Sequence, residues 1–198
     1  MNKYEIELEF IEPLLGTVPK DKEIYASYIQ KKVKKSKSVE DEIETVAEAE
    51  EKSWTGFHLV GGKPIIYDYV LKGFFKDACS MMRRVPKSKS SALKAHKKVI
   101  DGLVFISPRR IAINLNGGEI GVIERPLRAQ TPQGERVALA RSDYCPPGSK
   151  IKFNLSILGG IGLALLKEWL NYGELRGLGQ WRNAGYGSFV NKIGKAKA

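Results

Sequence analysis

Residues 177 to 189, with the sequence GLGQWRNAGYGSF, hold four glycines within eleven positions. The segment before them has the leucine spacing of a helix, and the segment after them has the pattern of a strand. Because glycine is entropically costly to fix, such a cluster indicates unusual backbone conformations or a close main-chain approach to a ligand. The fold must therefore place a tight helix-to-strand corner here.

The order of elements at this corner excludes two common phosphate-binding motifs. A Walker A loop needs Gly-Lys-Ser/Thr at the start of a helix, and the Rossmann fingerprint also runs from a strand into a helix. Here the order is reversed, so no helix N-terminus follows the loop to supply its dipole. Main-chain N–H groups remain as anion-binding groups, with charge from Arg176 and Arg182, and Trp181 could stack on a base. The alternative is a glycine turn with a packed tryptophan.

The other patterns in the chain predict an α+β fold. Residues 3–13 alternate between apolar and polar, as in a strand with one buried face. Residues 67–84 change to the three- and four-residue spacing of an amphipathic helix, and a shorter helix is expected over 91–101. The remaining expected elements are a strand over 103–115 with a bend at Pro108, a strand over 150–158, a helix over 160–173 and a strand over 186–193.

These elements occur in the order β-α-β-β-α-β once two insertions are set aside. That order suggests a ferredoxin-like (RRM-like) unit, in which four antiparallel strands carry two helices on one face. One insertion covers about residues 16–62 and is expected to be partly helical. The other, at about 120–144, predicts a projecting β-hairpin that carries Arg125, Arg128, Arg136 and Arg141. At 198 residues, the chain is expected to form one domain over 1–198.

The charge of the chain indicates an anionic partner. Its formal net charge is +11 and its pI is about 9.6. Nine lysines or arginines lie between Leu71 and Lys98, with one aspartate among them. Residues 31–37 are basic and residues 40–51 are acidic, which is typical of an exposed insertion; the alternative is an acidic cover for a basic surface. Nucleic acid and anionic membrane are the main candidate partners, and plain solubility is the third explanation.

Membrane and secretory classes are not supported. No apolar run reaches the roughly 18 residues of a membrane span, and the N-terminal segment MNKYEIELEF is too polar for a signal peptide. Cys79 and Cys145 form neither a metal-ligand cluster nor a disulfide framework, which fits a reducing compartment. We therefore expect a cytoplasmic protein without metal, cofactor or membrane contact.

The glycine corner resembles a motif of the RAMP superfamily, the repeat-associated RNA-binding proteins of CRISPR systems. That motif, G-x-G-x(5)-G-x-G-x followed by an aromatic or aliphatic residue, is matched by Gly177, Gly179, Gly185, Gly187 and Phe189. Leu71-Lys72-Gly73 also resembles the start of the first helix in backbone subunits of CRISPR effector complexes. The run LLKEWLNYGELRGLG is similar to their lead-in to the glycine loop.

The resemblance covers about residues 1–11, 64–84 and 148–193, somewhat less than half of the chain. It departs at residues 65–69, Ile-Ile-Tyr-Asp-Tyr, where those subunits have a proline-glycine-serine lead-in. Residues 20–62 match no segment of them. A stand-alone or virus-encoded relative is therefore an alternative to a subunit of a known effector.

The resemblance implies that the chain binds single-stranded RNA in a homo-oligomer or a heteromeric ribonucleoprotein. In this interpretation the first helix and the glycine loop lie at the phosphates, and the thumb-like hairpin separates bases. The alternative for the hairpin is ordinary surface arginines. The implied RNA-binding residues are Lys72, Lys76, Arg125, Arg128, Arg136, Arg141, Arg176, Gly177, Gly179, Trp181, Arg182, Gly185 and Gly187.

Two other functions stay open. Processing endoribonucleases of the same superfamily use general acid–base chemistry, often through histidine, on the RNA 2′-OH. The candidates here are His58, in a glycine-flanked stretch, and Asp21, placed roughly where target-cutting backbone subunits carry an aspartate. Neither has a recognisable catalytic partner in sequence, so binding without chemistry is favoured. The other hypothesis is a virus-encoded mimic that interferes with a CRISPR complex through protein contacts.

Overall fold

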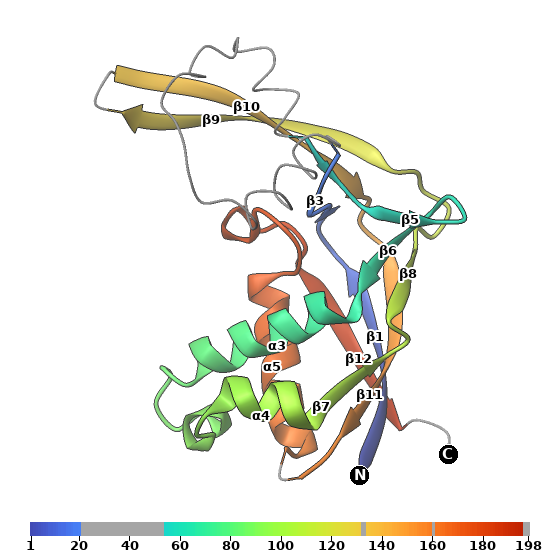
Figure 1. Ribbon diagram of the computed structural model, residues 1–198, viewed down its shortest axis with the longest axis vertical. Helices are drawn as coiled ribbons and strands as arrows, with labels where there is room; N and C mark the ends of the chain where they lie inside the picture. Colours follow the sequence, from blue (N-terminus) through green and yellow to red (C-terminus); the bar gives the residue numbers. More distant parts are fainter. Residues whose placement is uncertain (21–53, 132–133, 160, 196–198) are drawn as a thin grey trace, which may run out of the picture.

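The computed structural model describes residues 1–20, 54–131, 134–159 and 161–195. Within them the architecture is mixed α+β, with three α-helices and two β-sheets (Figure 1). The helices are α3 (Asp68–Met82), α4 (His96–Leu103) and α5 (Leu163–Arg176), with 3-10 turns η1 (Lys89–Ala92) and η2 (Arg182–Ala184). The strands are β1 (Asn2–Phe10), β2 (Leu14–Leu15), β3 (Val18–Pro19), β4 (Thr55–Gly56), β5 (His58–Val60), β6 (Lys63–Tyr67), β7 (Val104–Ser107), β8 (Arg110–Asn114), β9 (Gly121–Thr131), β10 (Gly134–Cys145), β11 (Lys150–Ile157) and β12 (Phe189–Lys195).

The larger sheet is built around β1. This strand pairs antiparallel with β11 on one side and with β12 on the other, so that Glu5 faces Asn154 and Gly194. The order of the sheet is β12-β1-β11-β8-β6-β5, and β7 also pairs with β11. The period-two pattern predicted for residues 3–13 is confirmed, since Ile6, Leu8 and Phe10 are buried and the residues between them are not.

The helices cover one face of this sheet, as Figure 1 shows. The apolar side of α3 presents Phe74 and Phe75 to the core, where Phe75 meets Trp169 of α5 at a ring-centroid distance of 5.8 Å. Cys79 and Cys145 are buried as free thiols. Among the described residues, no helix is long and apolar enough to cross a bilayer.

The strand predicted over residues 103–115 is divided by its bend. The segments β7 and β8 lie on either side of Pro108, and both pair antiparallel with β11. Because β7 meets residues 154–157 and β8 meets residues 150–151, the single strand β11 holds two consecutive segments at its two ends. Proline, which lacks a donor N–H, is suited to such a break in a ladder.

The predicted hairpin at 120–144 is present as β9 and β10, which pair along their whole length from Gly121↔Tyr144 to Thr131↔Gly134. In Figure 1 it extends as a long arm beyond the helices and the larger sheet. The base of β10 also pairs with β2 and, in parallel, with β4. These contacts join the arm to segments that lie more than eighty residues away in the chain.

Three expectations need adjustment. The helix expected over 91–101 is split, because Ala95 takes a left-handed conformation (φ +47°) and α4 begins after it. Short strands, not helices, occupy the described ends of the 16–62 insertion, and β5 and β6 around the Gly61-Gly62 turn were not foreseen. The charged blocks 31–37 and 40–51 lie outside the described residues.

Candidate nucleic-acid interface

The glycine corner has the unusual backbone that its composition predicts. Gly177, Gly179, Gly185 and Gly187 all have positive φ, at +74°, +88°, +88° and +74°. The first of them ends α5, where its N–H donates to the carbonyl of Gly173 at 2.8 Å. Glycine is favoured in this region of φ because other residues meet steric strain there. The corner therefore depends on its glycines for its shape.

The close contacts to the main chain of the corner come mostly from other residues of the same chain. The N–H of Leu178 donates to the carbonyl of Gly187 at 2.9 Å, and the N–H of Gly187 donates to the carbonyl of Pro13 at 2.9 Å. A Cβ on Gly187 would overlap the carbonyl oxygen of Leu178, and one on Gly177 would overlap that of Tyr186. A Cβ on Gly185, in contrast, would have no described atom within 4 Å.

The two arginines beside the corner share one carboxylate on α3. Nη1 of Arg182 lies 2.8 Å from Oδ2 of Asp77, and Nε of Arg176 lies 3.6 Å from the same oxygen. Arg176 also donates to Oδ1 of Asn183. The corner thus keeps about one net positive charge. Trp181, itself at a positive φ of +48°, meets the ring of Tyr186 edge-on at 6.0 Å.

Lys72 and Lys76 share a face of α3, as their spacing predicts, and that face adjoins α4. Nζ of Lys72 donates to the backbone carbonyl of Asp101, and Nζ of Lys76 donates to its Oδ1, both at 2.9 Å. The hydrogen bond from Lys76 lowers the pKa of the Asp101 carboxyl. Nζ of Lys72 also lies 5.5 Å from the ring centroid of Phe105.

The hairpin arginines differ in their surroundings. Nε of Arg141, near the base, lies 2.7 Å from Oε1 of Glu124 on the opposite strand. The side chain of Arg125 is exposed. Arg128 and Arg136 lie in β9 and β10, where only their backbone is described. Among the side chains that the structure describes, the predicted cations are not gathered into one cluster.

The two candidate catalytic residues are also placed separately. His58 lies in β5, with its ring edge-on to Tyr67 at 4.9 Å. Asp21 lies outside the described residues. The other histidine, His96, is buried on α4, where its Nδ1 accepts from Arg83 at 3.0 Å and burial lowers its pKa.

A buried carboxylate at the base of the hairpin was missed by sequence reasoning. Asp143, 6% exposed, accepts hydrogen bonds from Nζ of Lys20 and Nε1 of Trp54, each at 2.9 Å. Nζ of Lys20 also lies 4.3 Å from the centroid of the Trp54 ring. These residues are far apart in sequence, so no local pattern could reveal the cluster.

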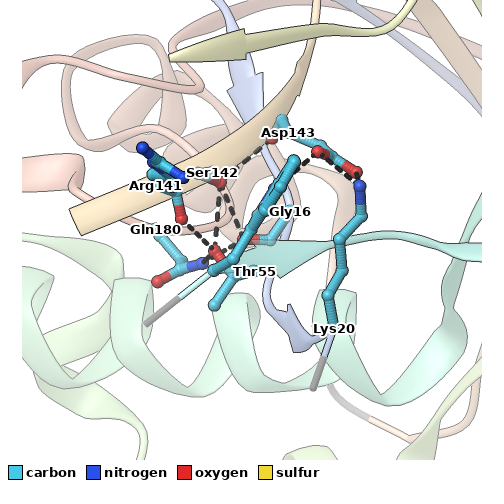
Figure 2. Close-up of polar contacts among 8 residues, drawn as sticks. Gly16, Lys20, Thr55, Arg141, Ser142, Asp143 and Gln180 are labelled. Atoms are coloured by element: carbon cyan, nitrogen blue, oxygen red, sulfur yellow. Dashed lines mark hydrogen bonds and ion pairs between the residues drawn. The ribbon is translucent and has the colours of Figure 1, made fainter. Parts of the chain in front are cut away.

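A neighbouring chain of polar contacts links the hairpin to the glycine corner (Figure 2). The side-chain amide of Gln180 donates to the carbonyl of Gly16 and, at 2.6 Å, to Oγ1 of Thr55. Thr55 donates in turn to Oγ of Ser142, which is fully buried in β10, at 3.1 Å. The hairpin base and the corner are therefore held in a fixed relation by hydrogen bonds.

The segment from 83 to 98 runs from the end of α3 into the first turn of α4 and carries seven exposed cations; we call it the basic connection. It holds no acidic residue. Within the described parts of the chain, none of its cations forms an ion pair with a carboxylate. Those cations are Arg83, Arg84, Lys87, Lys89, Lys94, Lys97 and Lys98.

The same arrangement of elements occurs in solved CRISPR assemblies. A chain in the cryo-EM structure of the Type III-B Cmr-beta bound to cognate target RNA matches 99% of this chain, with a TM-score of 0.55 and 11% sequence identity. The chain has a CRISPR-associated fold. A chain of a Type IV-B CRISPR complex also matches 99% of it, with a TM-score of 0.50 and 10% identity.

The two neighbours differ in how much of their own length this chain matches. The chain spans 61% of the Cmr-beta chain and 92% of the Type IV-B chain. No protein-family model matches the sequence, and no curated protein matches it. At such low identity the likeness establishes the fold and leaves the site residues to be argued from this chain.

Proposed function

We propose that this protein is an RNA-binding subunit of a CRISPR-type ribonucleoprotein, related to the backbone subunits of the RAMP superfamily. The observation that carries the proposal is the fold likeness over 99% of the chain to subunits of two CRISPR assemblies, one of them bound to RNA. The net charge of +11 supports an anionic partner of this kind.

Within this proposal, the central body is a ferredoxin-like unit. Its elements are β1, α3, β7, β11, α5 and β12 in chain order, which is the β-α-β-β-α-β order. The antiparallel pairs β12–β1, β1–β11 and β11–β7 support this assignment, as does the packing of both helices on one face. The 16–62 region and a thumb-like hairpin at 120–144 are then insertions into this unit, and β6, α4 and β8 are additions to it.

The RNA is proposed to run along the corner that joins α5 to β12, below the base of the hairpin. Around Gly185 the backbone has open space, and Arg176, Trp181 and Arg182 supply charge and a ring for stacking. Lys72 and Lys76 would exchange their contacts with Asp101 for phosphates. The hairpin arginines Arg125, Arg128, Arg136 and Arg141 would reach further along the strand.

The length of the hairpin supports assembly as well as binding. An arm of two strands, eleven and twelve residues long, exceeds what a connection between β8 and β11 needs. If it reaches a neighbouring copy, the contact is heterologous and does not close, so copies would add along RNA in a head-to-tail filament. A heteromeric complex would use the same arm on a different subunit.

Binding and assembly can be tested together. Light scattering of the purified protein with single-stranded RNA of increasing length should show masses that rise in steps. Replacement of residues 125–141 by a short Gly-Ser turn should leave a folded protein that binds weakly and without cooperativity. A mass that stays monomeric at every RNA length would contradict the assembly; absence of any RNA binding would contradict the function. Cleavage products in the same samples would instead favour an endoribonuclease.

A further inference from the structure

Three aromatic rings form a cluster where β5, β6 and α3 meet. The rings of Tyr67 and Tyr69 are nearly parallel, at 13°, with centroids 5.5 Å apart. The ring of His58 meets Tyr67 edge-on, at 79° and 4.9 Å. We call these three residues the aromatic platform. Two of them, Tyr67 and Tyr69, lie in the 65–69 segment that stands where the RAMP resemblance would predict a proline-glycine-serine lead-in before Leu71.

Tyr69 is the outer member of the platform and is not used by the core. It is 58% exposed, more than any other aromatic side chain among the described residues. Two positions later, Leu71 fills the core and is fully buried. Exposure of so large a ring leaves apolar area in water, at about 25 cal/mol for each Å². Its stacking on Tyr67 holds the ring in one orientation, which reduces the entropy that a ligand would have to remove.

The surroundings limit the kind of ligand. Tyr67, Tyr69 and His58 line a cavity shared with Leu178 and Gly179 of the glycine corner, but its volume is only about 20 Å³. That is room for one water molecule, so a ligand must lie outside, against a ring face. The platform is therefore a surface for stacking, placed directly beside the corner.

A cation lies next to the platform. Arg110 is the cross-strand partner of Tyr67 in the β6–β8 pair, so their Cβ atoms lie within about 5.5 Å of each other. Arg110 is exposed, and the preceding Arg109 accepts the first N–H of α3 through its carbonyl at 3.0 Å. Asp68 stands in the first turn of α3 and disfavours a phosphate directly at the helix end. The charge pattern therefore puts a phosphate on the Arg110 side.

We propose that the aromatic platform binds one nucleobase of single-stranded RNA by stacking on Tyr69, with the adjacent phosphate near Arg110. The proposal rests on the RNA-binding function proposed above and adds a site that the glycine motif does not include. Stacking of this kind accepts any base, because every base has a π face. A flat ring beside an exposed guanidinium suits a nucleotide better than an apolar protein segment, which would gain nothing from the charge.

The test compares three variants of the full chain. Binding is measured with a labelled oligouridine of about 16 nucleotides and with an abasic strand of the same length. Tyr69→Leu should weaken oligouridine binding about tenfold, since one stacked base contributes about 1–3 kcal/mol. Tyr69→Phe keeps the ring and should stay within about twofold of the parent. Phe105→Leu, at the next most exposed aromatic (48%), is the control for loss of an exposed ring; it keeps the neighbouring Lys72 and should weaken binding far less than Tyr69→Leu.

Two further measurements separate stacking from other causes. The salt dependence of binding should be the same for Tyr69→Leu and the parent, because a neutral ring releases no counterions. Photo-crosslinking of 4-thiouridine RNA to the unmodified protein should give an adduct at Tyr69, independently of how any variant folds.

The outcomes distinguish this site from the general function. Parent-like oligouridine binding by Tyr69→Leu would overturn the platform as a base site, leave the RNA-binding function intact and reassign the surface to a protein partner. An equal loss on oligouridine and on the abasic strand would also overturn it, because the interaction would not be with a base. Failure of the parent to bind any RNA would overturn both proposals.

Discussion

The glycine corner and the basic connection are the two regions that the sequence marks most strongly, and they are built in opposite ways. At the corner, polar groups form hydrogen bonds within the chain: Leu178 with Gly187, Gly187 with Pro13, and Gln180 with Thr55. In the basic connection, none of the seven side-chain cations forms a described ion pair, and the Glu168 carboxylate accepts only from the backbone N–H groups of Lys89 and Ser90 and from Oγ of Ser90. The comparison indicates that the backbone of the corner is held in place by its own chain, whereas the side-chain charges of the connection are available to an anionic partner.

The largest effect is expected within the corner itself. Gly187→Ala forces a left-handed conformation on alanine and places its Cβ onto the carbonyl oxygen of Leu178, so we expect a loss of about 3 kcal/mol or more of unfolding free energy. Gly185→Ala has similar φ strain but open space, and should lose only about 1 kcal/mol. Denaturant unfolding followed by circular dichroism measures both. Equal losses would show that the two glycines are not packed differently.

The next effect concerns the hairpin base beside the corner. Asp143→Ala removes the acceptor for Trp54 and Lys20 in a buried place, so we expect a loss of about 2 kcal/mol in unfolding free energy. Asp101→Ala, which removes an exposed acceptor of Lys76, is the control and should cost much less. Thermal or urea unfolding of the two variants would contradict this ranking if Asp101→Ala were the more destabilised.

A third experiment separates folding from binding in the basic connection. The triple variant Lys94→Gln/Lys97→Gln/Lys98→Gln should change unfolding free energy by no more than about 0.5 kcal/mol. If these cations meet RNA phosphates, the slope of log affinity against log salt should fall by about 0.7 for each lysine–phosphate pair that the variant removes.

The matched control for that variant lies on the open face of the larger sheet. Lys150→Gln/Lys152→Gln/Lys192→Gln removes the same charge, but these lysines are paired with Glu9 and Glu7. We expect its salt slope to stay closer to that of the parent. Identical slopes in the two triple variants would mean that only net charge matters and that the basic connection is not special.

The smallest effect is a pH dependence inside the basic connection. Burial, with the nearby charges of Arg83 and Lys97, lowers the pKa of His96 below its ordinary value of 6.5. As the pH falls, His96 therefore becomes protonated in the unfolded chain before it does so in the folded protein. The contribution of neutral His96 to the unfolding free energy is complete above pH 6.5 and is lost as the pH falls below that value. His96→Gln should flatten the stability profile there, as measured by unfolding between neutral and mildly acidic pH. The paired carboxylates Glu7 and Asp101 titrate lower, since hydrogen bonds from lysines lower their pKa values. An unchanged profile in the variant would remove His96 from the explanation.

Local pattern was enough to predict the elements whose burial alternates regularly. The strand β1 and the helix α3 have long, periodic sequences, and these two elements were each located to within a few residues, as was the hairpin β9–β10. The short strands β5 and β6 were not, because three to five residues around Gly61-Gly62 give no measurable period. The left-handed Ala95 that splits the 91–101 segment has no composition signal either.

The sequence could predict only those features of the candidate site that depend on a single residue type. Positive φ at four glycines follows from glycine itself, but the partners that close the corner come from Pro13 and Thr55, far away in sequence. Lys72 and Lys76 were placed on one face by their spacing, whereas Asp101 on that side depends on how α4 packs. Tertiary partners of this kind need the assembled chain.

The two buried cysteines give this molecule a pair of internal chemical reporters. Burial raises the pKa of Cys79, in α3 at the approach to the basic connection, and raises that of Cys145, at the base of the hairpin, to about 12. Both therefore stay protonated and shielded at neutral pH, and a thiol reacts as its thiolate. An alkylating reagent would label each one only when its own region opens. The two labelling rates, read separately by mass spectrometry, would report how often the helix layer and the arm come apart without any engineered probe.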